Sequence, residues 1–210
     1  MEPYYKTDKA VIYHSECQAV LADPHDLRMF GALISDPPWW VFEYAVMVEQ
    51  GVREYKATEE AIWIAKVQRF YSEWLPQVAL MTNLSMGRAF FWASPHHFPA
   101  FSRMALLAGW PTRRVWYAPE NEVLMQFGRP ITEDQNAAVA DAFQHSPHRP
   151  VKDDAMLEAV LAASHGPVFD PFMGTGSTLI AAVKAGRHAT GIECKEEVCE
   201  QAAKALEALG

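Results

Sequence analysis

The sequence predicts an α/β fold in which helices cover both faces of a mostly parallel β-sheet. Short apolar segments of strand length alternate with longer segments of helical periodicity, which is the order that builds such a sheet. One apolar strand runs directly into a glycine-containing loop and a helix start, the local order of a ligand-binding βαβ unit. With 50% apolar and 21% charged residues, the 210-residue chain has a globular composition, and we expect one domain over residues 1–210.

In the first half of the chain, short apolar or aromatic runs predict buried strands at 11–14, 32–35 and 89–93. Apolar residues at helical spacing predict a helix over 58–75. We expect Pro76 to end this helix, because proline has no amide hydrogen to donate. A further helix is predicted over 99–108, where Gly109 follows as a typical C-terminal cap.

The second half of the chain continues the same alternation. Strands are predicted at 114–117, 123–127, 168–170 and 188–192. Helices are predicted at 154–164, 177–185 and 196–209.

The net charge of −8 argues against a protein that holds nucleic acid by overall electrostatic attraction, because the phosphate backbone favours basic surfaces. A local basic strip can still bind DNA on an acidic protein. The middle third of the chain has residues for such a strip, namely Arg88, Arg103, Arg113, Arg114, Arg129, Arg149 and Lys152.

Targeting and metal-binding patterns are also informative. The sequence has no signal-peptide pattern and no apolar run of about 20 residues, so we expect a cytoplasmic protein without a membrane partner. Its three cysteines form no CxxC pair, and we expect free thiols. No set of histidines and cysteines completes a ligand pattern, so no metal is expected.

Residues 168–177 have the order of a strand, a Gly-x-Gly turn and a helix start. Glu193 follows at the end of the next strand, about 20 residues on, where such units place a carboxylate that accepts hydrogen bonds from ribose hydroxyls. Leu179 replaces the third glycine of the dinucleotide fingerprint, which disfavours NAD or FAD and leaves room for S-adenosylmethionine. A plain strand-to-helix connection has the same pattern, so a second motif must decide.

The second motif is Asp36-Pro37-Pro38-Trp39, directly after the strand at 32–35, where α/β proteins bind ligands. Its prolines make a stiff turn whose carbonyl oxygens remain acceptors. Asp36 and the Pro37 carbonyl could accept both N–H groups of an exocyclic base amine and so localise its lone pair on nitrogen for methyl transfer. Trp39 offers a flat face to a base rotated out of the duplex, although a core tryptophan in a proline-rich turn is the structural alternative.

Together these residues resemble the DNA amino-methyltransferases that act on adenine N6 or cytosine N4. The two marks of that family are an (Asp/Asn/Ser)-Pro-Pro-aromatic motif, here 36–39, and a Phe-x-Gly-x-Gly motif, here 172–176, in the order of the β group of bacterial and phage enzymes. The resemblance implies a Rossmann-like methyltransferase fold, S-adenosylmethionine as cofactor, duplex DNA as partner, and catalysis by Asp36, Pro37, Pro38 and Trp39. It implies cofactor contacts from Asp170, Pro171, Phe172, Gly174, Thr175, Gly176, Ser177 and Glu193.

The resemblance is looser elsewhere. His148 and Lys152 stand where the family often has His-Pro-Thr-x-Lys-Pro, and on that match alone they join the expected cofactor site. Glu16 stands near the family's usual Gly-Asp. Only 41–57 and 128–149 are left as target-recognition segments, and a homodimer is a family expectation.

Several alternatives stay open. Aspartate at position 36 favours adenine, because the similar cytosine enzymes more often have serine there, and relatives that modify protein glutamine have asparagine. Cytosine-N4 methylation of DNA, methylation of RNA adenine or of protein glutamine, and a non-catalytic nucleic-acid-binding module on the same fold remain as alternatives. The recognised DNA sequence and the biological role, whether restriction-modification, regulation or phage protection, are open as well.

Overall fold

The computed structural model of the chain describes residues 1–22, 30–37, 56–84, 87–93, 98–118, 122–146 and 153–209. Their strands are β1 (Tyr5–Lys6), β2 (Ala10–His14), β3 (Ala32–Ser35), β4 (Arg88–Ala93), β5 (Thr112–Ala118), β6 (Glu122–Gly128), β7 (Val168–Asp170) and β8 (Ala189–Glu193). Their helices are α1 (Cys17–Ala22), α3 (Ala57–Leu84), α4 (Phe98–Leu107), α5 (Glu133–His145), α6 (Asp154–Ala162), α7 (Ser177–Lys184) and α8 (Glu196–Glu207).

The described strands form one eight-stranded sheet in the order β1-β2-β8-β7-β3-β4-β6-β5. Neighbouring strands from β2 through β8, β7 and β3 to β4 are parallel. The sheet turns antiparallel only toward its edges, where β1 pairs with β2 and β6 pairs with β4 and β5. The predicted mostly parallel sheet is confirmed.

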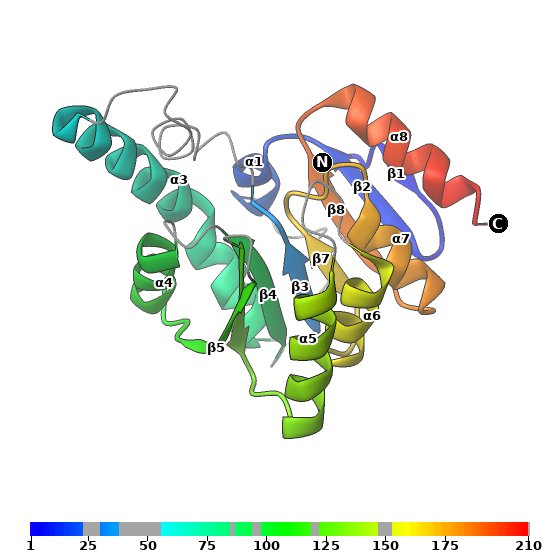
Figure 1. The fold of residues 1–210 in the computed structure, drawn as a ribbon. Helices are drawn as coiled ribbons and strands as arrows, with labels where there is room; N and C mark the ends of the chain where they lie inside the picture. The colour runs from blue at the N-terminus through cyan, green and yellow to red at the C-terminus, as the bar shows by residue number, and fades with distance from the viewer. Residues whose placement is uncertain are drawn as a thin grey trace.

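Helices cover both faces of this sheet (Figure 1). On one face α5, α6, α7 and α8 pack in a core cluster with Ala32 and Ile34 of β3. On the other face α1, α3 and α4 pack in a second cluster that includes Leu33, the residue between them. Because side chains alternate along a strand, three adjacent apolar residues supply both cores.

The direction of the chain across the sheet changes between β7 and β3. From β7 the chain continues through α7 to β8 on one side, and from β3 it continues to β4 on the other side, with α3 in between. The crossover helices therefore lie on opposite faces, α7 on one and α3 on the other. Such a topological switch point opens a crevice at the carboxyl ends of the two strands, where α/β proteins bind ligands.

Most predicted elements begin and end within about two residues of the observed ones. The expected end of a helix at Pro76 is wrong, since α3 continues to Leu84 with Pro76 inside it. Pro76 itself is exposed, whereas Leu75, Val78 and Ala79 around it are fully buried. Burial of this apolar face offsets the hydrogen bond that proline cannot make.

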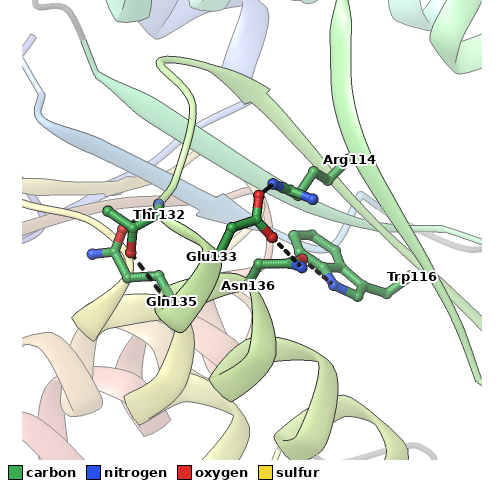
Figure 2. A network of polar contacts seen from close by, with 6 residues as sticks. All are labelled: Arg114, Trp116, Thr132, Glu133, Gln135 and Asn136. Carbon is green, nitrogen blue, oxygen red and sulfur yellow. Dashed lines mark hydrogen bonds and ion pairs between the residues drawn. The ribbon is translucent and has the colours of Figure 1, made fainter.

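The sequence analysis missed β1, α1 and α5. Helix α5 lies inside 128–149, a segment for which we predicted no regular element. It begins with a capping box, in which the Thr132 hydroxyl accepts from the Gln135 amide and the Gln135 side chain accepts from the Thr132 amide (Figure 2). None of the described helices has an apolar stretch long enough to cross a membrane.

Candidate functional site

The two predicted motifs meet at the switch point. Asp170 is the last residue of β7, and Asp36 directly follows β3, which pairs with β7 in parallel. Glu193 ends β8, the other neighbour of β7, and lies opposite His14 at the end of β2. Residues far apart in sequence thus gather at one edge of the sheet.

Asp170 is a fully buried carboxylate that shapes this edge. Its Oδ1 accepts a hydrogen bond of 2.5 Å from the hydroxyl of Ser35, the last residue of β3. The same oxygen accepts a second bond, of 3.1 Å, from the amide of Phe172, which fixes the turn after β7. Asp170, which the sequence analysis assigned to the cofactor site, therefore holds the start of the glycine loop in place through its buried carboxylate.

The catalytic motif is only partly described. Asp36 is half-buried and Pro37 is buried, while Pro38 and Trp39 lie outside the described residues. Tyr71 of α3, which is fully buried, lies near Asp36. Burial raises the pKa of the Tyr71 hydroxyl, and the charge of Asp36 raises it further, so this phenol stays neutral beside the carboxylate.

The glycine loop connects β7 to α7. Gly174 and Gly176 both have left-handed backbones, with φ of 53° and 84°. Among the described residues, no atom lies within 4 Å of a Cβ added at Gly174, whereas a Cβ at Gly176 would lie 2.9 Å from Cβ of Ala202 in α8. At Gly174 the described residues thus leave room for the predicted cofactor, while glycine at 176 lets the start of α7 pack closely on α8.

The other loop residues divide in the same way. Thr175 is exposed and Ser177, the first residue of α7, is half-buried, so both can reach a ligand. Pro171 is buried, and the ring of Phe172 packs edge-on against Trp74 of α3 with centroids 4.9 Å apart. Pro171 and Phe172 thus help to shape the loop, and the cofactor contacts expected of them stay a prediction.

Glu193 supplies a carboxylate at the end of β8. It is half-buried, and its Oε1 accepts a 2.9 Å hydrogen bond from the amide of Lys195. Among the described residues, none donates to its second oxygen. A half-buried carboxylate beside open glycine backbone fits the ribose and amino-acid parts of S-adenosylmethionine.

The cysteines gather around Glu193. Cys194 follows it directly, and the Cys199 thiol donates to its carbonyl oxygen. Burial raises the pKa of Cys17 to about 12, with a further contribution from Glu16. Burial also raises the pKa of Cys194, as do the charges of Glu193 and Glu16. Glu16 thus lies close to this end of the site, as the looser resemblance suggested.

Three of the arginines named for a possible basic strip lie away from this edge. The opposite end of the sheet, where Arg88 of β4 pairs with Gly128 of β6, holds Arg88, Arg113 and Arg129. Arg114 forms an ion pair with Glu133 of α5, beside the hydrogen bond from Trp116 to Asn136 (Figure 2). Arg149, His148 and Lys152 lie outside the described residues.

Two functional candidates were missed by the sequence analysis, Ser35 and Tyr71. Ser35 stood at the end of a predicted apolar strand, where a buried hydroxyl was a visible signal of a polar partner. Tyr71 belonged to a helical apolar pattern, and nothing in that pattern marked it as a neighbour of Asp36.

Comparison with known proteins is consistent with this geometry. Residues 108–204 match the family model of the N6/N4 DNA methylases, described as DNA methylase. The matched part holds the glycine loop and Glu193, whereas Asp36 lies outside it.

Solved structures share the fold over nearly the whole chain. The PvuII DNA methyltransferase, which is cytosine-N4-specific, has a TM-score of 0.65 at 13% identity, over 97% of this chain and 88% of its own. TTHA0409 of Thermus thermophilus, a candidate DNA modification methylase in complex with S-adenosyl-L-methionine, has a TM-score of 0.64 at 17% identity, over 94% and 93%. The M1.HpyAVI–SAM complex has a TM-score of 0.62 at 18% identity, over 94% and 98%.

At these identities the solved structures show the fold alone, which is the predicted Rossmann-like methyltransferase fold. The family model adds a match in sequence through the cofactor loop. Residues 108–204 therefore match the N6/N4 DNA methylases, and two of the structures that share the fold are complexes with S-adenosylmethionine.

Proposed function

We propose that this protein transfers a methyl group from S-adenosylmethionine to the N6 amino group of adenine in DNA, with the base rotated out of the duplex. The observation that carries the proposal is the meeting of Asp36 and the glycine loop at the switch point between β3 and β7. An acceptor for an amine and a loop suited to a nucleoside lie on adjacent strand ends, which a methyl transfer in line between them requires.

The cofactor, when bound, supplies a methyl group already activated by the positive sulfur. The residues of this chain then have to hold the amine and its protons. The Asp36 carboxylate accepts one N–H of the base and the Pro37 carbonyl accepts the other, which concentrates the lone pair on the nitrogen. The Asp36 carboxylate would then take the proton that the amine loses on methylation and pass it to solvent.

Cofactor binding is assigned to the residues of the loop and to Glu193. We assign Asp170, Gly174 and Gly176 to the methionine part, with further contacts from Thr175 and Ser177, and Glu193 to the ribose hydroxyls. The room beside Gly174 and the partial exposure of Glu193 support this assignment. His148 and Lys152 complete the proposed set on sequence resemblance alone.

The wider parts of the proposal rest on sequence pattern and family resemblance. They are a single domain over 1–210, duplex DNA as partner, target recognition from 41–57 and 128–149, and a homodimer. Aspartate at position 36 supports adenine over cytosine.

Transfer of labelled methyl groups to mixed-sequence duplex DNA, followed by separation of the nucleosides by mass spectrometry, tests the proposal. Labelled N6-methyladenine is the expected product. Labelled N4-methylcytosine would show that the target base is cytosine and would overturn the adenine assignment. Label in RNA or protein but not in DNA, or in none of them, would overturn the proposal.

A further inference from the structure

The hydrogen bond between Ser35 and Asp170 joins the two halves of the proposed site. Both residues are fully buried, and 135 positions separate them in sequence. The 2.5 Å distance from Oγ to Oδ1 lies in the range of a hydroxyl that donates to an ionised carboxylate, which is among the stronger hydrogen bonds in proteins.

On the cofactor side, this bond reaches the loop through one further step. The oxygen that accepts from Ser35 also accepts from the amide of Phe172. The next amide, that of Met173, donates to the carbonyl of Ile192 in β8 at 3.0 Å. Ser35 therefore orients the carboxylate that fixes the start of the glycine loop.

On the catalytic side, Ser35 immediately precedes Asp36 in the sequence. Helix α3 braces both segments from one face of the sheet, since Trp74 and Phe70 contact Phe172 and Tyr71 lies near Asp36. If the Asp170 carboxylate moved, the glycine loop would shift relative to the aromatic residues of α3. Ser35 at the end of β3 would then lose its hydrogen-bond partner.

We propose that Ser35 is a positioning residue whose hydroxyl interlocks the cofactor loop with the base-binding end of β3. The ligands named for the two sides rest on the proposed function. The interlock itself is a property of the chain and can be tested without catalysis.

The test removes the hydroxyl in Ser35→Ala of the full chain and measures two quantities. Hydrogen exchange by mass spectrometry on the peptide that contains residues 170–177 is expected to become faster than in the wild type. The Kd of S-adenosylmethionine, measured by calorimetry, is expected to rise about tenfold, which is about 1.4 kcal/mol. With DNA present, kcat at saturating cofactor should fall as well.

A matched control is Ser102→Ala, which removes the hydroxyl pair of 2.8 Å between Ser102 of α4 and Thr112 of β5. This variant should leave both quantities unchanged, even if its melting temperature falls as far as that of Ser35→Ala. If Ser35→Ala does not fold, the comparison is made between Ser35→Thr and Ser35→Val, which have the same shape and differ in the hydroxyl. Threonine should then retain slow exchange and cofactor affinity, and valine should lose both.

Loop exchange and cofactor affinity that stay at wild-type values after loss of the hydroxyl would overturn the interlock. The same holds if Ser102→Ala changes them equally. A wild-type protein that binds no S-adenosylmethionine would overturn the proposed function instead, and loop exchange would still decide whether Ser35 holds the loop.

Discussion

Gly174 and Gly176 show how two residues of one motif serve different ends. Both have left-handed backbones, and the Gly-x-Gly motif accordingly has glycine at both positions. Their surroundings differ, because no atom of the described residues would approach a Cβ at Gly174, whereas a Cβ at Gly176 would meet Ala202 of α8. One glycine is thus proposed to admit the cofactor, and the other admits a neighbouring helix.

Alanine at each position should separate these roles. Gly174→Ala is expected to lower the free energy of unfolding by about 1 to 2 kcal/mol, the usual cost of a left-handed non-glycine residue, and to weaken S-adenosylmethionine binding. Gly176→Ala should cost more stability, because its added methyl group also collides with α8. Urea unfolding and calorimetric titration measure the two effects. Equal losses of stability, or full cofactor affinity in Gly174→Ala, would contradict this division.

Cys194 lies at the surface beside Glu193 and Glu16, and the partial desolvation of its thiol, together with these charges, raises its pKa. Because the thiolate is the reactive form, alkylation by iodoacetamide at pH 8 should be slower than that of an unstructured cysteine peptide. Glu193→Gln should lower the pKa of Cys194 and speed the reaction. Bound S-adenosylmethionine should slow it in the wild type, because a ribose held by Glu193 would shield the adjacent thiol from the reagent. Equal rates in the wild type and Glu193→Gln would show that the carboxylate does not act on this thiol.

At the scale of elements, local rules failed where tertiary burial decided the outcome. The rule that proline ends a helix holds for an isolated segment, and α3 passes through Pro76 because the residues around it are fully buried. Helix α5 was missed although its capping box at Thr132 and Gln135 is visible in the sequence. Its few apolar positions, Val139 and Phe143 among them, gave a weak periodic signal.

Pro76→Ala tests the account of α3. Alanine restores an amide that can donate to the carbonyl one turn earlier, so the free energy of unfolding should rise, by between about 1 and 3 kcal/mol. Gln77→Ala, an exposed neighbour, should change it by less than about 0.5 kcal/mol. Denaturant unfolding of both variants measures the difference. A loss of stability in Pro76→Ala would mean that the bend at proline is required for packing.

At the scale of the whole molecule, the fold class, most strands and the order of the two motifs followed from the sequence. Alternating periodicities and the strand endings at Asp36, Asp170 and Glu193 carried that information. The pairing of β3 with β7 did not follow, because strand order depends on long-range packing that no local pattern records. Ser35 and Tyr71 were missed for this reason, since each matters through a partner distant in sequence.

The central claim is that Asp36 and the glycine loop form one methyl-transfer site, in which Asp36 acts on the amine and the loop binds the cofactor. The most direct test is a comparison of Asp36→Ala with the wild type, in S-adenosylmethionine binding and in methyl transfer to duplex DNA. The account predicts that Asp36→Ala keeps the cofactor Kd within about twofold of the wild type, while transfer falls by about a thousandfold, as expected for loss of a group that handles the amine protons. Unchanged transfer in Asp36→Ala would contradict the account.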